Sequence, residues 1–124
     1  MIRIDLPRSH QHLVFSGTIV RLQFNVYEKS FIEQTHYGHM PVLELYDWLV
    51  ENVGYEINTF RQLDRPYYDT CKVPKGIETI GSHDEWEAKN PPVVGARTWK
   101  MAIRGEAILF TTLELATLFK LRWF

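Results

Sequence analysis

Residues 98–124, TWKMAIRGEAILFTTLELATLFKLRWF, are the stretch that decides the fold. The first part, 98–103, alternates apolar and polar side chains and so predicts a β-strand. The apolar positions of that strand are Trp99, Met101 and Ile103. Arg104-Gly105 predicts a turn, and 106–111 reads as the returning strand. The stretch therefore begins with a predicted β-hairpin.

A helix is predicted directly after the hairpin, over residues 112–122. Thr111 and Glu114 have the spacing of a capping box, in which a threonine and a glutamate three residues later satisfy backbone N–H groups of the first turn. One face of this helix is apolar through Leu115, Phe119 and Trp123. That face is expected to cover the sheet.

Two earlier segments carry equally clear patterns. Residues 18–26, TIVRLQFNV, alternate as expected for an antiparallel strand with one side in water. HLVF, residues 12–15, is predicted to be the hairpin partner of that strand. Residues 41–53 predict a helix, because apolar side chains fill one side, Pro41 suits the first helical position and Gly54 suits the end.

Together these elements predict an α+β fold. It is an antiparallel sheet of about five strands packed against a central helix, about 41–53, and a C-terminal helix, about 112–122. A parallel sheet is disfavoured because strands and helices do not alternate regularly. The remaining predicted elements are strands at 2–6, 55–60 and 76–80 and a helix at 82–89 with its own capping box, Ser82 and Glu85. The length predicts one domain over residues 1–124.

The composition limits the partners and compartments that fit. The 14 basic and 15 acidic residues nearly cancel, which argues against nucleic acid and against an anionic membrane surface as partners. Cys71 is the single cysteine, so no disulfide can form within the chain. MIRIDLPRSH at the start lacks the apolar core of a signal peptide, and no apolar run approaches the roughly 18 residues of a membrane helix. We therefore expect a cytoplasmic protein.

Four histidines form two close pairs that are candidates for metal binding, His10 with His12 and His36 with His39. Neutral imidazole is a good ligand for zinc, copper and nickel. The pairs match no recognised metal motif, and no cysteine or carboxylate stands at a recognised ligand spacing from them. The favoured interpretation is ordinary surface histidines, with no metal and no cofactor.

The candidate ligand-binding loop is 61–76, where Arg61 and Arg65 precede Tyr67 and Tyr68. Loops on a rigid scaffold often carry function, and these side chains could hold an anion or a base. A solvated loop, or one that covers the core, is the alternative. No nucleophile elbow, dinucleotide fingerprint or phosphate-binding loop motif is present, so no catalytic residue is assigned.

Apolar side chains with no element assigned to cover them form a candidate interaction surface. The helix at 112–122 has a second apolar face, and on the helix at 41–53 Trp48 falls beside the polar stripe, where it should be at least partly exposed. Either the loop 61–76 folds over this second face, or the face is an exposed apolar patch, and such patches tend to mark interaction surfaces. The predicted surface consists of Trp48, Leu113, Leu121 and Phe124.

Two classes of function fit these observations. The first is a binding or regulatory protein that acts by protein–protein interaction, with a protein partner or a second copy of the chain; inhibitors and immunity-type proteins of mobile elements are analogous. The alternative is a small-molecule-binding protein or small enzyme, with a pocket between sheet and helices and a dependence on histidine-bound metal. The abundant aromatic residues and the missing catalytic motifs favour the first class.

Overall fold

The computed structural model describes residues 1–25, 27, 30–59, 67–68, 83–89 and 91–124. The α+β class is as predicted, and helices are present near 41–53 and 112–122. The chain folds as two compact units. The first comprises Met1–Ser16, Gly38–Asn58 and Gly95–Phe124, and the second comprises Gly17–Tyr37 and Thr59–Val94.

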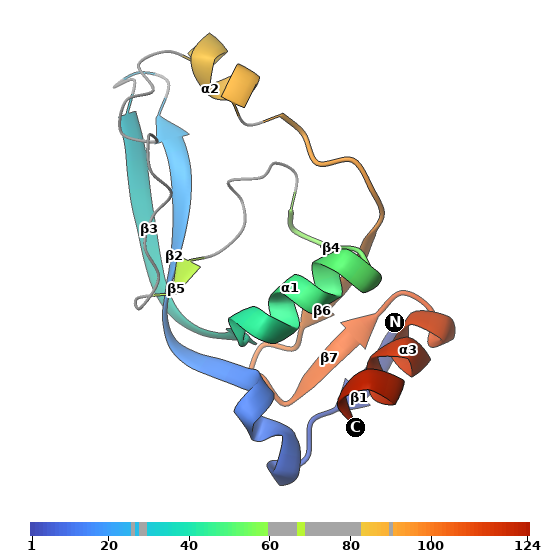
Figure 1. Cartoon of the computed structure of the whole chain (residues 1–124). Coiled ribbons are helices and arrows are strands. Elements are labelled where there is room, and N and C mark those ends of the chain that lie inside the picture. Colours follow the sequence, from blue (N-terminus) through green and yellow to red (C-terminus); the bar gives the residue numbers. More distant parts are fainter. Residues whose placement is uncertain (26, 28–29, 60–66, 69–82, 90) are drawn as a thin grey trace. The chain divides into compact units, whose positions relative to one another are not determined.

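The first unit contains a four-stranded sheet in the order β1-β7-β6-β4 (Figure 1). The strands are β1 (Ile2–Asp5), β4 (Tyr55–Glu56), β6 (Arg97–Met101) and β7 (Ala107–Phe110). The predicted hairpin is confirmed, because β6 and β7 pair antiparallel with Trp99 opposite Phe110. Ile103 was expected on the strand, but β6 ends at Met101 and Ile103 is exposed in the turn.

The expectation of a wholly antiparallel sheet is wrong at β4, which pairs parallel with β6. A parallel pair needs a crossover of a dozen or more residues, and the chain between these two strands is long enough to supply one. The predicted strand at 55–60 is correspondingly shorter, since only Tyr55–Glu56 joins the sheet.

Two helices and a short 3-10 helix complete the first unit, namely α1 (Leu43–Asn52), α3 (Leu113–Trp123) and η1 (Arg8–Leu13). α3 packs against β1 and β7, and α1 packs near β4. Large side chains that are fully buried form the core, among them Trp99, Phe110, Phe119, Leu45 and Leu49. The Trp99 indole also donates a hydrogen bond of 2.8 Å to the Gly54 carbonyl, which ties the strand to the end of α1.

The start of α1 differs from the prediction. Pro41 ends strand β3 instead of opening the helix, and Val42 is the N-cap residue. The Val42 amide donates to the Leu13 carbonyl at 2.9 Å, while the Val42 carbonyl accepts the first helical hydrogen bond from Tyr46. The helix therefore begins after this tether.

Gly54 ends α1 as predicted, and its conformation requires glycine. Its φ is +140°, a region that other residues rarely adopt. A Cβ atom at this position would overlap the Thr98 hydroxyl and would lie 2.7 Å from the Ala96 carbonyl oxygen. The close approach of the strand is therefore possible only without a side chain here.

The second sheet has the order β3-β2-β5 (Figure 1). Its strands are β2 (Val14–Asn25), β3 (Ser30–Pro41) and β5 (Tyr67–Tyr68), and the helix α2 is His83–Lys89. The predicted strand at 18–26 lies almost wholly in β2, but it belongs to this sheet and not to that of β6 and β7. An alternating pattern defines the faces of a strand without naming its neighbours, and here the neighbours of β2 are β3 and β5.

The hairpin partner predicted at 12–15 is also wrong, because Val14 and Phe15 already belong to β2. The strand next to β2 is β3. In its sequence, SFIEQTHYGHMP, polar residues do not keep to every second position, so there is no clear period-2 signal. The predicted strand at 76–80, Ser82 of the predicted cap and most of loop 61–76 lie outside the described residues. Within the described part of the chain, no helix has both the length and the apolar character to cross a membrane.

Candidate interaction surface

The inner face of α3 fixes the direction of its outer face. Ala116 and Phe119 are fully buried, and the Phe119 ring lies 5.3 Å from the Phe110 ring of β7. Side chains half a turn away must therefore point away from the sheet.

The N-terminus of α3 is capped by Thr112, one residue later than predicted. The Thr112 hydroxyl accepts a hydrogen bond of 3.3 Å from the Leu115 amide. Thr111 is held in the strand register instead, because its amide donates to the Thr98 carbonyl at 2.9 Å. Glu114 stands in the first turn and Lys120 and Arg122 in the last, so the charges suit the helix dipole.

The outer face of α3 carries several exposed leucines, with the exposed Glu114 between Leu118 and Leu121. Leu113 exposes 66% of its surface and Leu121 exposes 79%, and Leu118 is exposed beside them. Thr117 lies between the two outermost leucines, and its hydroxyl donates to the Leu113 carbonyl at 2.8 Å. Since this hydroxyl is already hydrogen-bonded within the helix, Thr117 adds little polarity to the face. We call Leu113, Thr117, Leu118 and Leu121 the outer stripe.

Phe124 belongs only partly to this surface. It is 46% exposed, but its ring stacks on the His10 ring at 4.1 Å and meets the Phe119 ring at 5.6 Å. The Lys120 ammonium lies 5.8 Å from the ring centre. The stacking of His10 on Phe124 could not be predicted from the sequence, because no local pattern relates residues so far apart in the chain.

Trp48 is half-buried, which agrees with the expected partial exposure. Its ring meets the Trp123 ring edge-on, with centroids 6.1 Å apart. Trp123 also lies under the Arg122 guanidinium, 4.4 Å from the ring. Its buried indole nitrogen has no hydrogen-bond partner among the residues described. Trp48 therefore contacts α3 from α1, and its part in the interaction surface stays a prediction.

The histidine pairs lie on different elements. His10 and His12 belong to η1, with ring centres 6.3 Å apart, whereas His36 and His39 lie in β3. The His39 ring shares a hydrogen bond of 2.7 Å with the Ser16 hydroxyl. Across the described ranges, no three histidine, cysteine or acidic side chains are grouped as metal ligands would be.

Only Tyr67 and Tyr68 of the candidate ligand-binding loop are described, and they form β5 against Ile19–Val20 of β2. Arg61 and Arg65 lie outside the described residues. The backbone of the two tyrosines thus has a place in the sheet, and the ligand-binding role of this segment stays a prediction.

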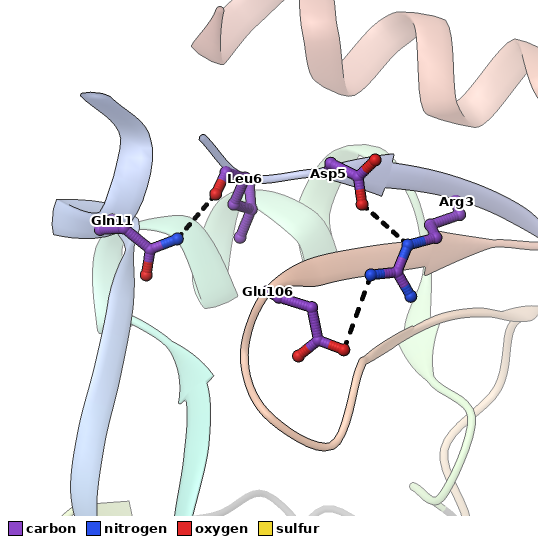
Figure 2. A network of polar contacts seen from close by, with 5 residues as sticks. All are labelled: Arg3, Asp5, Leu6, Gln11 and Glu106. Carbon is purple, nitrogen blue, oxygen red and sulfur yellow. Dashed lines mark hydrogen bonds and ion pairs between the residues drawn. The ribbon is translucent and has the colours of Figure 1, made fainter. Parts of the chain in front are cut away.

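A small polar network surrounds β1 (Figure 2). The Arg3 guanidinium bonds to the Asp5 carboxylate at 2.8 Å and approaches Glu106 at 3.6 Å. The Asp5 hydrogen bond raises the pKa of Arg3. The Gln11 amide donates to the Leu6 carbonyl at 2.7 Å and so fastens η1 to the end of the strand. Exposed ion pairs of this kind contribute little energy, so we assign this network a structural role.

Comparisons with protein-family models, with curated proteins and with solved structures each found no match. The functional argument therefore rests on the molecule's own surface. The feature with the clearest physical consequence is the outer stripe, since it places large apolar side chains in water on a helix whose other face is firmly anchored.

Proposed function

We propose that the protein is a small binding protein that acts by protein–protein interaction through the outer stripe of α3. The observation that carries the proposal is the exposure of Leu113 and Leu121, 66% and 79%, on one face of a capped helix. Leaving such side chains in water forgoes the stabilisation that burial would bring, about 1.5–3 kcal/mol for each leucine. A bound protein would recover that energy.

The spacing of the stripe indicates the form of the bound segment. Leu113, Thr117 and Leu121 stand four residues apart and so form one ridge along the helix. Ridges of this kind pack into the groove of another helix at an axis separation of about 8–10 Å. The expected occupant is therefore an amphipathic helix of a protein. An inhibitor or immunity-type role is one form that such binding could take.

The experiment is affinity capture by a tagged copy of the protein in cells that also express an untagged copy. Any retained protein, including the untagged chain, is identified by mass spectrometry and then titrated in purified form. The test variant is Leu113→Glu/Leu121→Glu, which keeps helix propensity. The matched control is Ile103→Glu, because Ile103 is 94% exposed in the turn after β6 and outside α3.

The proposal expects a purified partner, foreign or identical, that binds the wild type and the control but not the stripe variant. Retention of no protein, or of a protein that binds all three forms equally, would overturn it.

A further inference from the structure

We infer that the open edge of β1 pairs with the same edge of a second copy of this chain, antiparallel and centred on Ile4. The inference concerns a different surface from the outer stripe and goes beyond the proposed function. It is carried by the backbone groups that β1 directs away from its own sheet and by the order of two opposite charges along the strand.

The hydrogen bonds of β1 determine which residues face its open edge. β1 is the terminal strand of the first sheet, and the Leu6 amide, which follows it in the same register, donates to the Glu106 carbonyl at 2.8 Å. In an antiparallel ladder, residues that bond to the neighbouring strand alternate with residues that do not. Leu6 and Ile4 therefore bond towards β7, whereas Arg3 and Asp5 direct their N–H and C=O groups away from it.

This edge is regular and accessible. Arg3 and Asp5 are exposed, and among the described residues no backbone hydrogen bond from outside the strands reaches their outward groups. The register with β7 runs without a shift from Ile2 to Asp5, and Pro7 comes only after the strand has ended. A strand edge with a row of unpaired N–H and C=O groups is a template for another strand.

The charges select a second copy and one register. An antiparallel pair about a two-fold axis can be centred on Arg3, Ile4 or Asp5. The first and third arrangements place two like charges directly opposite each other, which is destabilising. Centring on Ile4 instead places Arg3 of one copy opposite Asp5 of the other, and two-fold symmetry repeats this attractive pair.

The intramolecular ion pair is compatible with this arrangement. Within one chain the Arg3 guanidinium bonds to the Asp5 carboxylate at 2.8 Å (Figure 2), so both side chains lie on the same face of β1. In the pair of strands, each charge keeps this neighbour along the strand and gains an opposite charge across it. The four charges then alternate in sign around the axis.

The pairing would satisfy the outward backbone groups of β1. Arg3 and Asp5 of the other copy would exchange two hydrogen bonds in each of the two pairs, which gives four bonds in all. Ile4 would meet its counterpart at the axis. Since Ile4 is only half-buried in one chain, the pairing would also remove apolar surface from water.

The length of β1 limits the strength of the dimer. The strand has 4 residues, so the contact is much smaller than a standard interface of roughly 800 Å² per partner, and exposed charge pairs add little energy. We therefore expect a dissociation constant on the order of 100 μM. A dimer of this strength dissociates during the washes of an affinity capture, so the test of the proposed function is unaffected by it.

The first experiment is sedimentation equilibrium of the full chain from about 5 to 1000 μM, a range set around the expected constant. The wild type should pass from the chain mass of 14.7 kDa towards twice that mass. Asp5→Arg should weaken the dimer about tenfold, because it replaces two attractive pairs by two repulsive ones. Arg3→Asp/Asp5→Arg should restore the affinity, because opposite charges again face each other. Circular dichroism checks that each variant is folded.

The second experiment tests the register by disulfide formation in a Cys71→Ser background, which removes the single native cysteine. Ile4→Cys places two thiols at the axis, within disulfide reach. Ile2→Cys is the matched control, since Ile2 is also half-buried on the same face. Its two copies would lie four strand positions apart, about 14 Å, which no disulfide spans. Under mild oxidation at about 100 μM, a concentration near the expected constant, Ile4→Cys should form the covalent dimer at least about tenfold faster than the control.

Three outcomes would overturn the inference. One is a wild type that remains monomeric up to the highest concentration. Another is a dimer whose affinity does not change in Asp5→Arg, which would place the contact away from β1. The third is equal cross-linking of Ile4→Cys and Ile2→Cys, which would exclude the register centred on Ile4.

Discussion

Substitutions on the two faces of α3 should differ sharply in their effect on stability. Phe119 is completely buried, with its ring 5.3 Å from Phe110 and 5.6 Å from Phe124. Replacing a buried phenylalanine by alanine typically costs about 3–5 kcal/mol, through lost transfer energy and the cavity that remains. Leu121, two residues on, is mostly in water, so Leu121→Ala should change the free energy of unfolding by no more than about 0.5 kcal/mol.

The assay is urea and thermal unfolding followed by circular dichroism, at a concentration low enough that only monomers are present. For a chain of 124 residues, about 1 kcal/mol corresponds to a shift of about 4 °C in Tm. Phe119→Ala should therefore lower Tm by about 12–20 °C, and Phe119→Leu should fall between it and the wild type. A loss for Leu121→Ala similar to that for Phe119→Ala would mean that the outer stripe is covered in the monomer, and the reasoning about its exposure would be refuted.

Three further predictions test the local structure and the histidines. Thr112→Ala should lower the free energy of unfolding by about 1 kcal/mol, as loss of an N-cap does, and Thr111→Ala should lower it by less. The reverse order would mean that Thr111 is the N-cap, as the sequence predicted. Gly54→Ala should cost more than about 1 kcal/mol, because its positive φ and close neighbours exclude a side chain; an unchanged urea midpoint would contradict this. Elemental analysis of the purified protein should return no stoichiometric transition metal; about one zinc, nickel or copper per chain, lost in His36→Ala/His39→Ala, would support the metal-dependent alternative.

The elements that were predicted correctly carry their information locally. The β6–β7 hairpin has an alternating strand, a turn and a second strand within 14 consecutive residues, 98–111. The helices α1 and α3 show a sustained apolar face, so their existence was predictable although their first residues were not. Adjacent threonines are both good N-caps, and the sequence does not show that the Thr111 amide bonds to the Thr98 carbonyl while Thr112 caps the helix.

The arrangement of strands depends on pairing that no single strand encodes. β2 alternates clearly, but the same alternation would serve in either sheet. β3 has polar residues on both of its faces in the sequence, so its pattern did not predict that it pairs with β2. The parallel pairing of β4 depends on the chain leaving the first unit and returning to it, and a two-residue strand offers too short a pattern to show that.

The candidate surface illustrates the same division between local and distant information. The exposure of Leu121 follows from the helical period once the inner face of α3 is known, because Leu121 lies opposite Ala116 and Phe119. The environment of Phe124 does not, because its ring rests on His10, which comes from the other end of the sequence.

This difference determines which side chains can report on binding without disturbing the fold. A substitution at Phe124 would remove the stack on His10 and the contact with Phe119, and aromatic pairs of this kind contribute about 0.5–1.5 kcal/mol each beyond area burial. If such a variant lost binding, the altered surface and the lower stability would both be possible causes, and the binding measurement would not separate them. Leu113 and Leu121 lie on the same helix and are more exposed, so replacing them alters the surface while the inner contacts of α3 remain. A loss of association in the leucine variant, at unchanged unfolding free energy, can therefore be attributed to the outer stripe itself.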